Sequence, residues 1–182
     1  DGLREVAFPE GFREIAPYAF SACLNLRRVV LPESLEGLGA SAFEHCQKLE
    51  EIVLPGKLAI VPRGAFKGCF ALGRVGGGLG VAEVGAQAFM NCRALAAAPD
   101  FPAVESIGRR AFAGCRELRS VEFPSLLRAL GDEAFMNCPN LESVVFPEEI
   151  DEVGQGVFKS CPKVNPVCAP ERVRGKLFSA PA

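Results

Sequence analysis

Apolar residues return along this chain with a fixed period of 23 residues. Seven phenylalanines keep this spacing without a slip: Phe20, Phe43, Phe66, Phe89, Phe112, Phe135 and Phe158. Each is followed three residues later by a cysteine: Cys23, Cys46, Cys69, Cys92, Cys115, Cys138 and Cys161. A period of about 20–50 residues is typical of stacked repeats, because one unit alone cannot bury its apolar face. We therefore predict about seven stacked units over residues 1–168 and a C-terminal tail over residues 169–182.

Within a unit, the spacing of the apolar positions predicts the local structure. The second unit contains the full set: Leu26, Val29, Leu31, Leu35, Leu38, Ala42, Phe43 and Cys46. The end of Leu-x-x-Val-x-Leu alternates inward and outward as a short strand does, and Pro32 ends that strand because proline cannot donate to a ladder. Gly39 suits a tight turn. The following A-F-x-x-C segment is predicted to form a single helical or 3-10 turn, with Phe and Cys on its inner face.

The full pattern, L-x-x-V-x-L-P-x-x-L-x-x-I-G-x-x-A-F-x-x-C, resembles the BspA-type branch of the leucine-rich repeats over about residues 1–168. The resemblance implies an α/β repeat fold: a leucine-rich-repeat solenoid with a parallel sheet on one side and short helical or 3-10 turns opposite. It also implies cell-surface or secreted, adhesion-type roles for many members. The residues themselves leave the compartment open, so an intracellular or organellar complex remains an alternative.

A column is the set of equivalent residues, 23 apart, in successive units. We expect function in the outward-facing columns of the predicted sheet, because the inward-facing columns form the core and bear only on the fold. One column contains Glu5, Arg28, Glu51 and Arg74, and the next contains Ala7, Val30, Val53 and Gly76. These columns have two interpretations. The first is a solvent face stabilised by a charge ladder, with β-branched residues chosen for strand propensity. The second is a protein-binding strip in which Val30 and Val53 are apolar contacts and Arg28 and Arg74, with Glu51 between them, are polar anchors.

A glycine-rich segment in the middle of the chain departs from the repeat. Its glycines replace the expected Leu-Pro strand end: Gly73, Gly76, Gly77, Gly78 and Gly80. A phosphate-binding loop does not fit, because Leu79 stands where the lysine is required. Either the repeat sequence has degenerated here, in a stack that tolerates such changes, or the segment forms a flat patch around Gly76 and Gly77 against which another backbone or helix packs.

Charge and hydropathy restrict the class of partner. The chain has 20 basic and 22 acidic residues among 182, which gives a formal net charge of −2. This balance argues against nucleic acid, whose binding needs a concentrated basic face. No apolar run approaches the roughly 18 residues that span a bilayer. We therefore expect a protein partner.

The cysteine column is predicted to hold reduced, buried thiols that pack as small apolar groups. Equivalent side chains in a parallel ladder point the same way, about 4.8 Å apart, whereas a disulfide needs Cβ atoms turned toward each other at about 3.8 Å. A linear stack does not converge on a metal ion, and His45 beside the buried Cys46 lacks the exposed setting of a reactive thiol. No catalytic, cofactor or metal site is predicted. Cys168 falls in an outward column. It is either reactive, or paired with an external cysteine, or a partly buried thiol in a frayed last unit.

The two ends of the chain differ in character. Leu3, Val6, Phe8 and Phe12 would present an apolar edge, so we expect either further chain before Asp1 or another subunit over that edge. Prolines near the other end predict a capped edge. Two functional hypotheses follow. The first is a non-enzymatic module that binds another protein through one face, and the second is a structural accessory subunit within a larger assembly.

Overall fold

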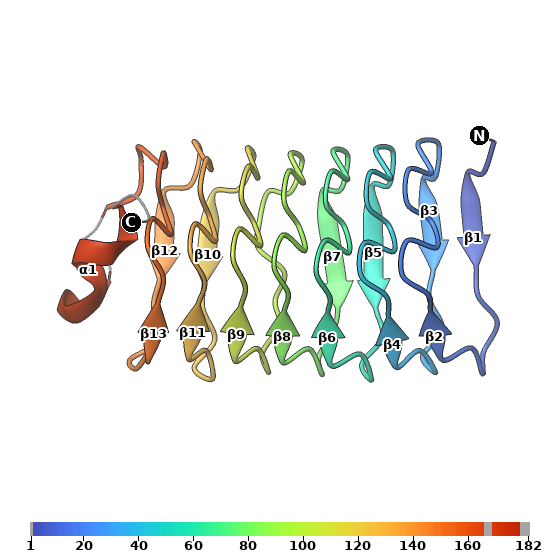
Figure 1. Cartoon of the computed structure of the whole chain (residues 1–182), viewed down its shortest axis with the longest axis horizontal. Helices are drawn as coiled ribbons and strands as arrows, with labels where there is room; N and C mark the ends of the chain where they lie inside the picture. Colours follow the sequence, from blue (N-terminus) through green and yellow to red (C-terminus); the bar gives the residue numbers. More distant parts are fainter. Residues whose placement is uncertain (1, 166–168, 179–182) are drawn as a thin grey trace.

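Each 23-residue period forms one coil of a parallel stack in the computed structural model, which describes residues 2–165 and 169–178 (Figure 1). The first strand of a coil belongs to what we call the first ladder: β1 (Glu5–Ala7), β3 (Arg28–Val30), β5 (Glu51–Leu54), β7 (Arg74–Gly77), β10 (Ser120–Glu122) and β12 (Ser143–Val145). The strands pair as β1–β3, β5–β7 and β10–β12, always in parallel and always between residues 23 apart. The predicted solenoid with a parallel sheet is confirmed.

A second ladder of two-residue strands runs beside the first, and the sequence analysis did not predict it. Its strands are β2 (Glu14–Ile15), β4 (Gly37–Leu38), β6 (Ile60–Val61), β8 (Glu83–Val84), β9 (Ser106–Ile107), β11 (Ala129–Leu130) and β13 (Glu152–Val153). A glycine follows five of these strands (β4, β8, β9, β11 and β13), and it serves close approach between coils instead of a tight turn. A Cβ on Gly85, for example, would lie 2.7 Å from the backbone nitrogen of Arg63.

The A-F-x-x-C segments form hydrogen-bonded turns that do not continue as helices. In the second coil, the Glu44 N–H donates to Ser41 O and the Cys46 N–H to Phe43 O, both at 3.1 Å. Ser41 and His45 have φ of 54° and 61°, and this left-handed conformation interrupts any helix. The same two positions have positive φ in every complete coil. The predicted helical or 3-10 turn is therefore replaced by short hydrogen-bonded turns that left-handed residues separate. The inward placement of Phe and Cys is confirmed.

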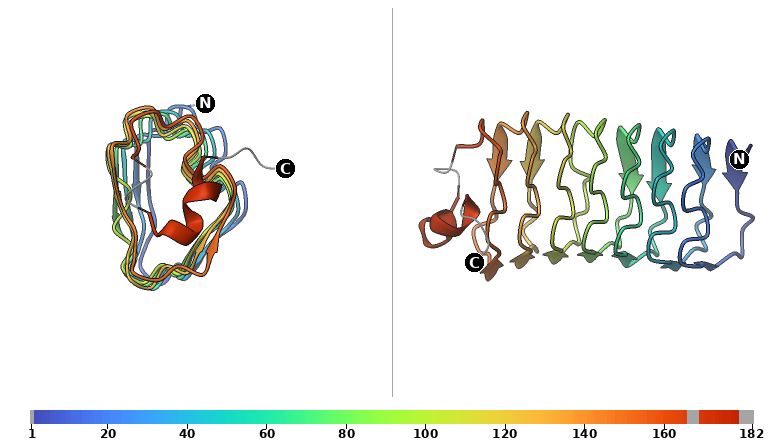
Figure 2. Two further views of the ribbon diagram at one scale, coloured as in Figure 1. Left: turned by 90° about the vertical axis from the view of Figure 1, so that its left-hand side faces the viewer. Right: turned by 45° about the horizontal axis from the view of Figure 1, so that its top comes forward.

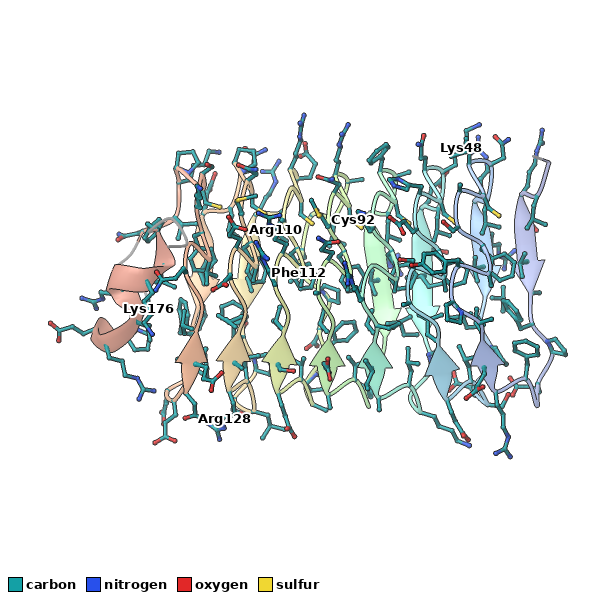
Figure 3. All side chains as sticks on the ribbon, viewed as in Figure 1. Lys48, Cys92, Arg110, Phe112, Arg128 and Lys176 are labelled. Atoms are coloured by element: carbon teal, nitrogen blue, oxygen red, sulfur yellow. The ribbon has the colours of Figure 1, made fainter. Side chains whose placement is uncertain are left out.

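Phenylalanine rings form a continuous stack through the core. Neighbouring centroids lie 5.7 Å apart for Phe43 and Phe66, 5.3 Å for Phe66 and Phe89, and 5.1 Å for Phe89 and Phe112. The planes of these pairs differ by 12° or less. Figure 3 shows the labelled Phe112 and Cys92 side chains among the ribbons of the coils. Stacking thus buries aromatic area that one coil could not bury alone.

The cysteine column lies beside the phenylalanine stack as free thiols, buried from Cys46 to Cys161 and half-buried at Cys23. Each buried thiol also donates a hydrogen bond to the phenylalanine carbonyl of the preceding coil, as from Cys69 Sγ to Phe43 O at 3.1 Å. The prediction of reduced, buried thiols is confirmed, and these donors add a coil-to-coil contact that it lacked. Burial raises the pKa of the Cys115 thiol to about 12. Cys168 lies outside the described residues.

The helix α1 (Glu171–Leu177) covers the last coil (Figure 2). The Gly156 N–H donates to Lys176 O and the Phe158 N–H donates to Leu177 O, each at 2.8 Å. Val173 and Leu177 are buried against the coil. Within the described ranges, no helix has the length and hydrophobicity needed to cross a membrane.

Candidate functional site

The outer face of the first ladder brings the predicted strip of valines together. Val30 and Val53 project outward from β3 and β5, with 42% and 60% of their surfaces exposed. Val53 is in register with Gly76 of β7, where a Cβ would find only Val53 Cγ2, at 3.8 Å. The strip is therefore an exposed apolar surface on two neighbouring strands, β3 and β5, with open space at its Gly76 end.

The charged column lies beside this strip, but its members do not form the predicted ladder of ion pairs. Glu5 is in register with Arg28, and Glu51 with Arg74. All four side chains are exposed, and no ion pair within 4.0 Å joins them among the described residues. The neighbouring column instead contains a pair, Arg27 with Glu50 at 3.3 Å. The charges of Arg28, Glu51 and Arg74 are thus available to a partner.

The glycine-rich segment has structural causes that the sequence analysis did not recognise. Gly77 and Gly78 have φ of 70° and 71°, a conformation that L side chains rarely adopt. A Cβ on Gly77 would also contact the carbonyl oxygen of Leu54, and one on Gly78 would lie 2.6 Å from the Phe101 ring. The segment is therefore not simply a degenerated repeat. Gly76 has room for a side chain, so it alone among these three can be substituted without strain.

A hollow of about 910 Å³ opens on the same face, where residues 97–102, β10 and the end of β12 line it together with the residues that follow these strands. Residues 97–102 belong to the coil between β7 and β10, in which Figure 1 shows no strand of the first ladder. Only an isolated bridge, Ala97 with Ser120, connects the intervening coil to β10. Asp100, Glu122, Val145 and Glu148 are among the residues that line the hollow. Sequence reasoning missed it, although the Phe-Pro step at residues 101–102 is displaced by one residue and signals an altered strand end.

Titratable groups outside this face mostly hold coils together. Arg110 Nε donates to Glu133 Oε2 at 2.6 Å, and the Glu133 side chain is almost fully buried. Lys67 Nζ lies 2.9 Å from Glu44 Oε1. Burial alone would raise the pKa of Glu44, but hydrogen bonds from Lys67 and Ser41 bring it below its ordinary value. Each pair links residues 23 apart and so joins neighbouring coils.

The residues considered for catalysis or metal binding do not converge in the structure. The Cys46 thiol donates to Phe20 O at 3.2 Å, while His45 Nε2 lies 3.6 Å from Glu44 Oε1. Among residues 2–165 and 169–178, no group of three or more His, Cys, Asp or Glu side chains is placed to hold a metal ion.

Comparisons with known proteins agree with this geometry. The sequence profile of the BspA type leucine rich repeat region, which contains six copies of the repeat, matches residues 1–96 and 82–177. A search of curated protein sequences gives no match.

Two solved structures show how far the likeness extends. The crystal structure of the T. pallidum leucine rich repeat protein TpLRR has a TM-score of 0.87 and 32% sequence identity, over 98% of this chain and 87% of that chain. The pneumococcal vaccine antigen PcpA has a TM-score of 0.58 and 17% identity, over 98% of this chain and 61% of that chain. The second likeness concerns the fold alone.

Proposed function

Because this chain belongs to the BspA-type leucine-rich repeat family, we propose that it is a non-enzymatic module that binds another protein through the outer face of its first ladder. The observation that carries the proposal is the exposed strip of Val30 and Val53 beside Arg28, Glu51 and Arg74, whose charges are not paired with one another. An apolar centre flanked by arginine is the composition that binding hot spots favour.

The rigidity of the strip supports this function. Val30 and Val53 each sit on a strand with a hydrogen-bonded partner, β3 with β1 and β5 with β7, and a β-branched side chain has few rotamers to lose on binding. Each valine is about half exposed, so covering it contributes roughly half of the 1.5–3 kcal/mol that full burial provides. That is too little alone, because a stable interface buries about 1,000 Å² or more. The partner would therefore extend over several coils.

The space beside Gly76 gives the strip a shape that a partner can recognise. Val53 protrudes from β5, whereas Gly76 leaves its register position on β7 bare. A bulky side chain of the partner would fit next to Val53 and contact the backbone at Gly76 directly. Gly77 then acts indirectly, by fixing the end of β7 in its left-handed conformation.

Affinity capture with matched surface variants tests this function. The tagged chain, Val53→Arg and Ile60→Arg are used as baits on extract from the native source. Ile60 is an exposed β-branched residue on β6 of the second ladder, so it controls for the added arginine. A partner protein captured by the unchanged chain and by Ile60→Arg, but lost with Val53→Arg, supports the proposal. Equal capture by both variants, with unchanged melting temperatures, would show that the first ladder is not the binding face.

Exposed apolar side chains on the first coil favour the alternative of an accessory subunit. Strands β1 and β2 each have a partner on one side only. Leu3 and Phe12 are 42% and 39% exposed there, and the Phe12 ring lies 5.0 Å from that of Phe8. A neighbouring subunit would cover these side chains. Light scattering on the isolated chain separates the two functions, since a stable monomer supports the binding module and aggregates that a partner dissolves support the subunit.

A further inference from the structure

The hollow beside β10 and β12 has a definite cause in the sequence of the coil that precedes β10. Ala98 occupies the inward position that Val29, Ile52 and Val75 hold in earlier coils. A small internal cavity of about 20 Å³ adjoins Ala98 and Phe101. The smaller residue and the displaced Phe-Pro step together draw this coil out of the ladder, and a surface depression results.

The ladder also lacks one backbone hydrogen bond at this point, beyond the Ala97–Ser120 bridge. In two other coils the residue after the strand donates to the next coil, from the Phe8 N–H to Val30 O at 3.0 Å and from the Phe123 N–H to Val145 O at 2.9 Å. The equivalent residues here are Asp100 and Glu122, and no backbone hydrogen bond joins them. Both residues line the hollow. A segment lying in the hollow would meet main-chain groups that the ladder does not use.

The charge of the hollow is one-sided. Four of the chain's 22 acidic residues line it (Asp100, Glu122, Glu148 and Glu149), but only one of its 20 basic residues, Arg128. Arg128 is already engaged, because its Nη1 lies 3.9 Å from Glu149 Oε2 and 3.5 Å from Glu149 O. Among the described residues, Asp100, Glu122 and Glu148 have no ion-pair partner within 4.0 Å. A concave, unneutralised acidic surface attracts and concentrates cationic groups.

The rest of the lining is suited to aliphatic side chains. Four prolines contribute to it: Pro99, Pro102, Pro124 and Pro147. Val145 projects beside them from β12 with 50% of its surface exposed. Prolines are fixed in φ and lose little entropy when a ligand covers them. Such a surface accommodates the methylene stems of lysine or arginine while the charged ends reach the carboxylates.

We propose that this hollow binds an extended, basic segment of a partner protein. Lysine or arginine side chains pair with Asp100, Glu122 and Glu148, and their stems pack on the prolines and Val145. The volume lies within the range of about 300–1,000 Å³ typical of ligand pockets, so a few residues of the segment would occupy it. The inference rests on the proposed function, since it assigns a partner chemistry to a further part of the first-ladder face.

Binding of a synthetic peptide tests the proposal without the natural partner. The probe is a short fluorescein-labelled peptide of alternating lysine and alanine, and the reference peptide has glutamate in place of lysine. Fluorescence anisotropy is measured on the full chain at about 50 mM and about 200 mM salt, because ion pairing weakens as salt rises. We expect saturable binding of the lysine peptide that weakens with salt, and no binding of the glutamate peptide.

Two triple variants with the same change of net charge decide where the peptide binds. One carries Asp100→Asn, Glu122→Gln and Glu148→Gln, and the other carries Glu33→Gln, Glu83→Gln and Glu152→Gln. All six side chains are exposed, so these near-isosteric changes leave the fold intact, which circular dichroism verifies. The first triple should raise the dissociation constant at least about tenfold, equivalent to about 1.4 kcal/mol, and the second should leave it within about twofold. An equal loss in both triples, or no loss in the first, would overturn the proposal.

A third variant separates this proposal from the binding function of the valine strip. Val53→Arg should leave peptide affinity unchanged, because Val53 is not among the residues that line the hollow. Retained peptide binding in Val53→Arg, together with capture of the partner by that variant, would refute the role of the strip but not that of the hollow. Carbodiimide coupling of the bound lysine peptide gives a direct readout. Cross-links to Asp100, Glu122 or Glu148 support the hollow, and cross-links elsewhere alone contradict it.

Discussion

Truncation of Phe89 to alanine tests the stacked core most sharply. The Phe89 side chain is fully buried, and its ring lies between those of Phe66 at 5.3 Å and Phe112 at 5.1 Å. The substitution removes contacts with both neighbouring coils at once. In a repeat array, stability is a sum of unit terms and nearest-neighbour interface terms, so one change weakens two interfaces.

The magnitude follows from burial and from position in the stack. Replacing a buried phenylalanine with alanine costs about 3–5 kcal/mol, and this cost already includes two ring contacts of about 0.5–1.5 kcal/mol each. Phe20 is the matched control, because its side chain is only half-buried and it stacks on Phe43 alone, with an edge contact to Phe8. We expect Phe20→Ala to cost about half as much as Phe89→Ala.

Urea unfolding followed by circular dichroism measures both variants. The unfolding free energy comes from the midpoint and the slope, provided that the slope stays constant between variants. A cost below about 1 kcal/mol for Phe89→Ala, typical of a surface change, would show that the ring is not packed between two coils. An equal cost for Phe20 and Phe89 would show that stack position does not matter, contrary to the nearest-neighbour account.

Three further predictions concern thiols, glycines and a buried ion pair. The Cys115 pKa is raised to about 12 in the folded chain, so the unfolded chain loses its proton first. This thiol alone should lower the unfolding free energy by about 1.4 kcal/mol per pH unit between about pH 9 and about pH 12, in addition to the other buried thiols whose pKa is raised; Cys115→Ala should reduce the slope by one proton in urea titrations at several pH values. Gly77→Ala should destabilise the fold by at least about 1 kcal/mol through its positive φ, whereas Gly76→Ala should leave the melting temperature unchanged. Glu133→Ala should lower the unfolding free energy by about 2–3 kcal/mol, because it leaves the half-buried guanidinium of Arg110 unpaired. Glu142→Ala, which removes the exposed pair with Lys163, should have no measurable effect on urea unfolding.

The sequence was sufficient for the parts of the fold that depend on large, repeated side chains. The phenylalanine and cysteine columns predicted the period and the inward faces, because each residue is repeated in every coil. The second ladder was missed because its strands have only two residues and show no alternation. The left-handed positions were missed because Gln87, Arg110 and Glu133 stand where other coils have Gly64 or Gly156, which obscures the glycine signal.

The candidate site could be predicted only in part. Its columns were correctly placed side by side, since register in a parallel stack follows from the period. Whether Glu51 and Arg74 form an ion pair depends on side-chain conformation, and the sequence does not determine it. The hollow depends on Ala98 and on a single displaced Phe-Pro step, two small departures whose joint effect appears only when the coils are stacked.

Site-specific photo-cross-linking tests the central functional claim most directly. A photoreactive benzoylphenylalanine is placed at position 53 on the first ladder or at position 60 on the second ladder, where both natural residues are exposed. The chain is irradiated in extract from its native source, and cross-linked products are identified by mass spectrometry. The account predicts a defined partner cross-linked from position 53 and not from position 60. The same partner from both positions, or from position 60 alone, would contradict recognition through the first ladder.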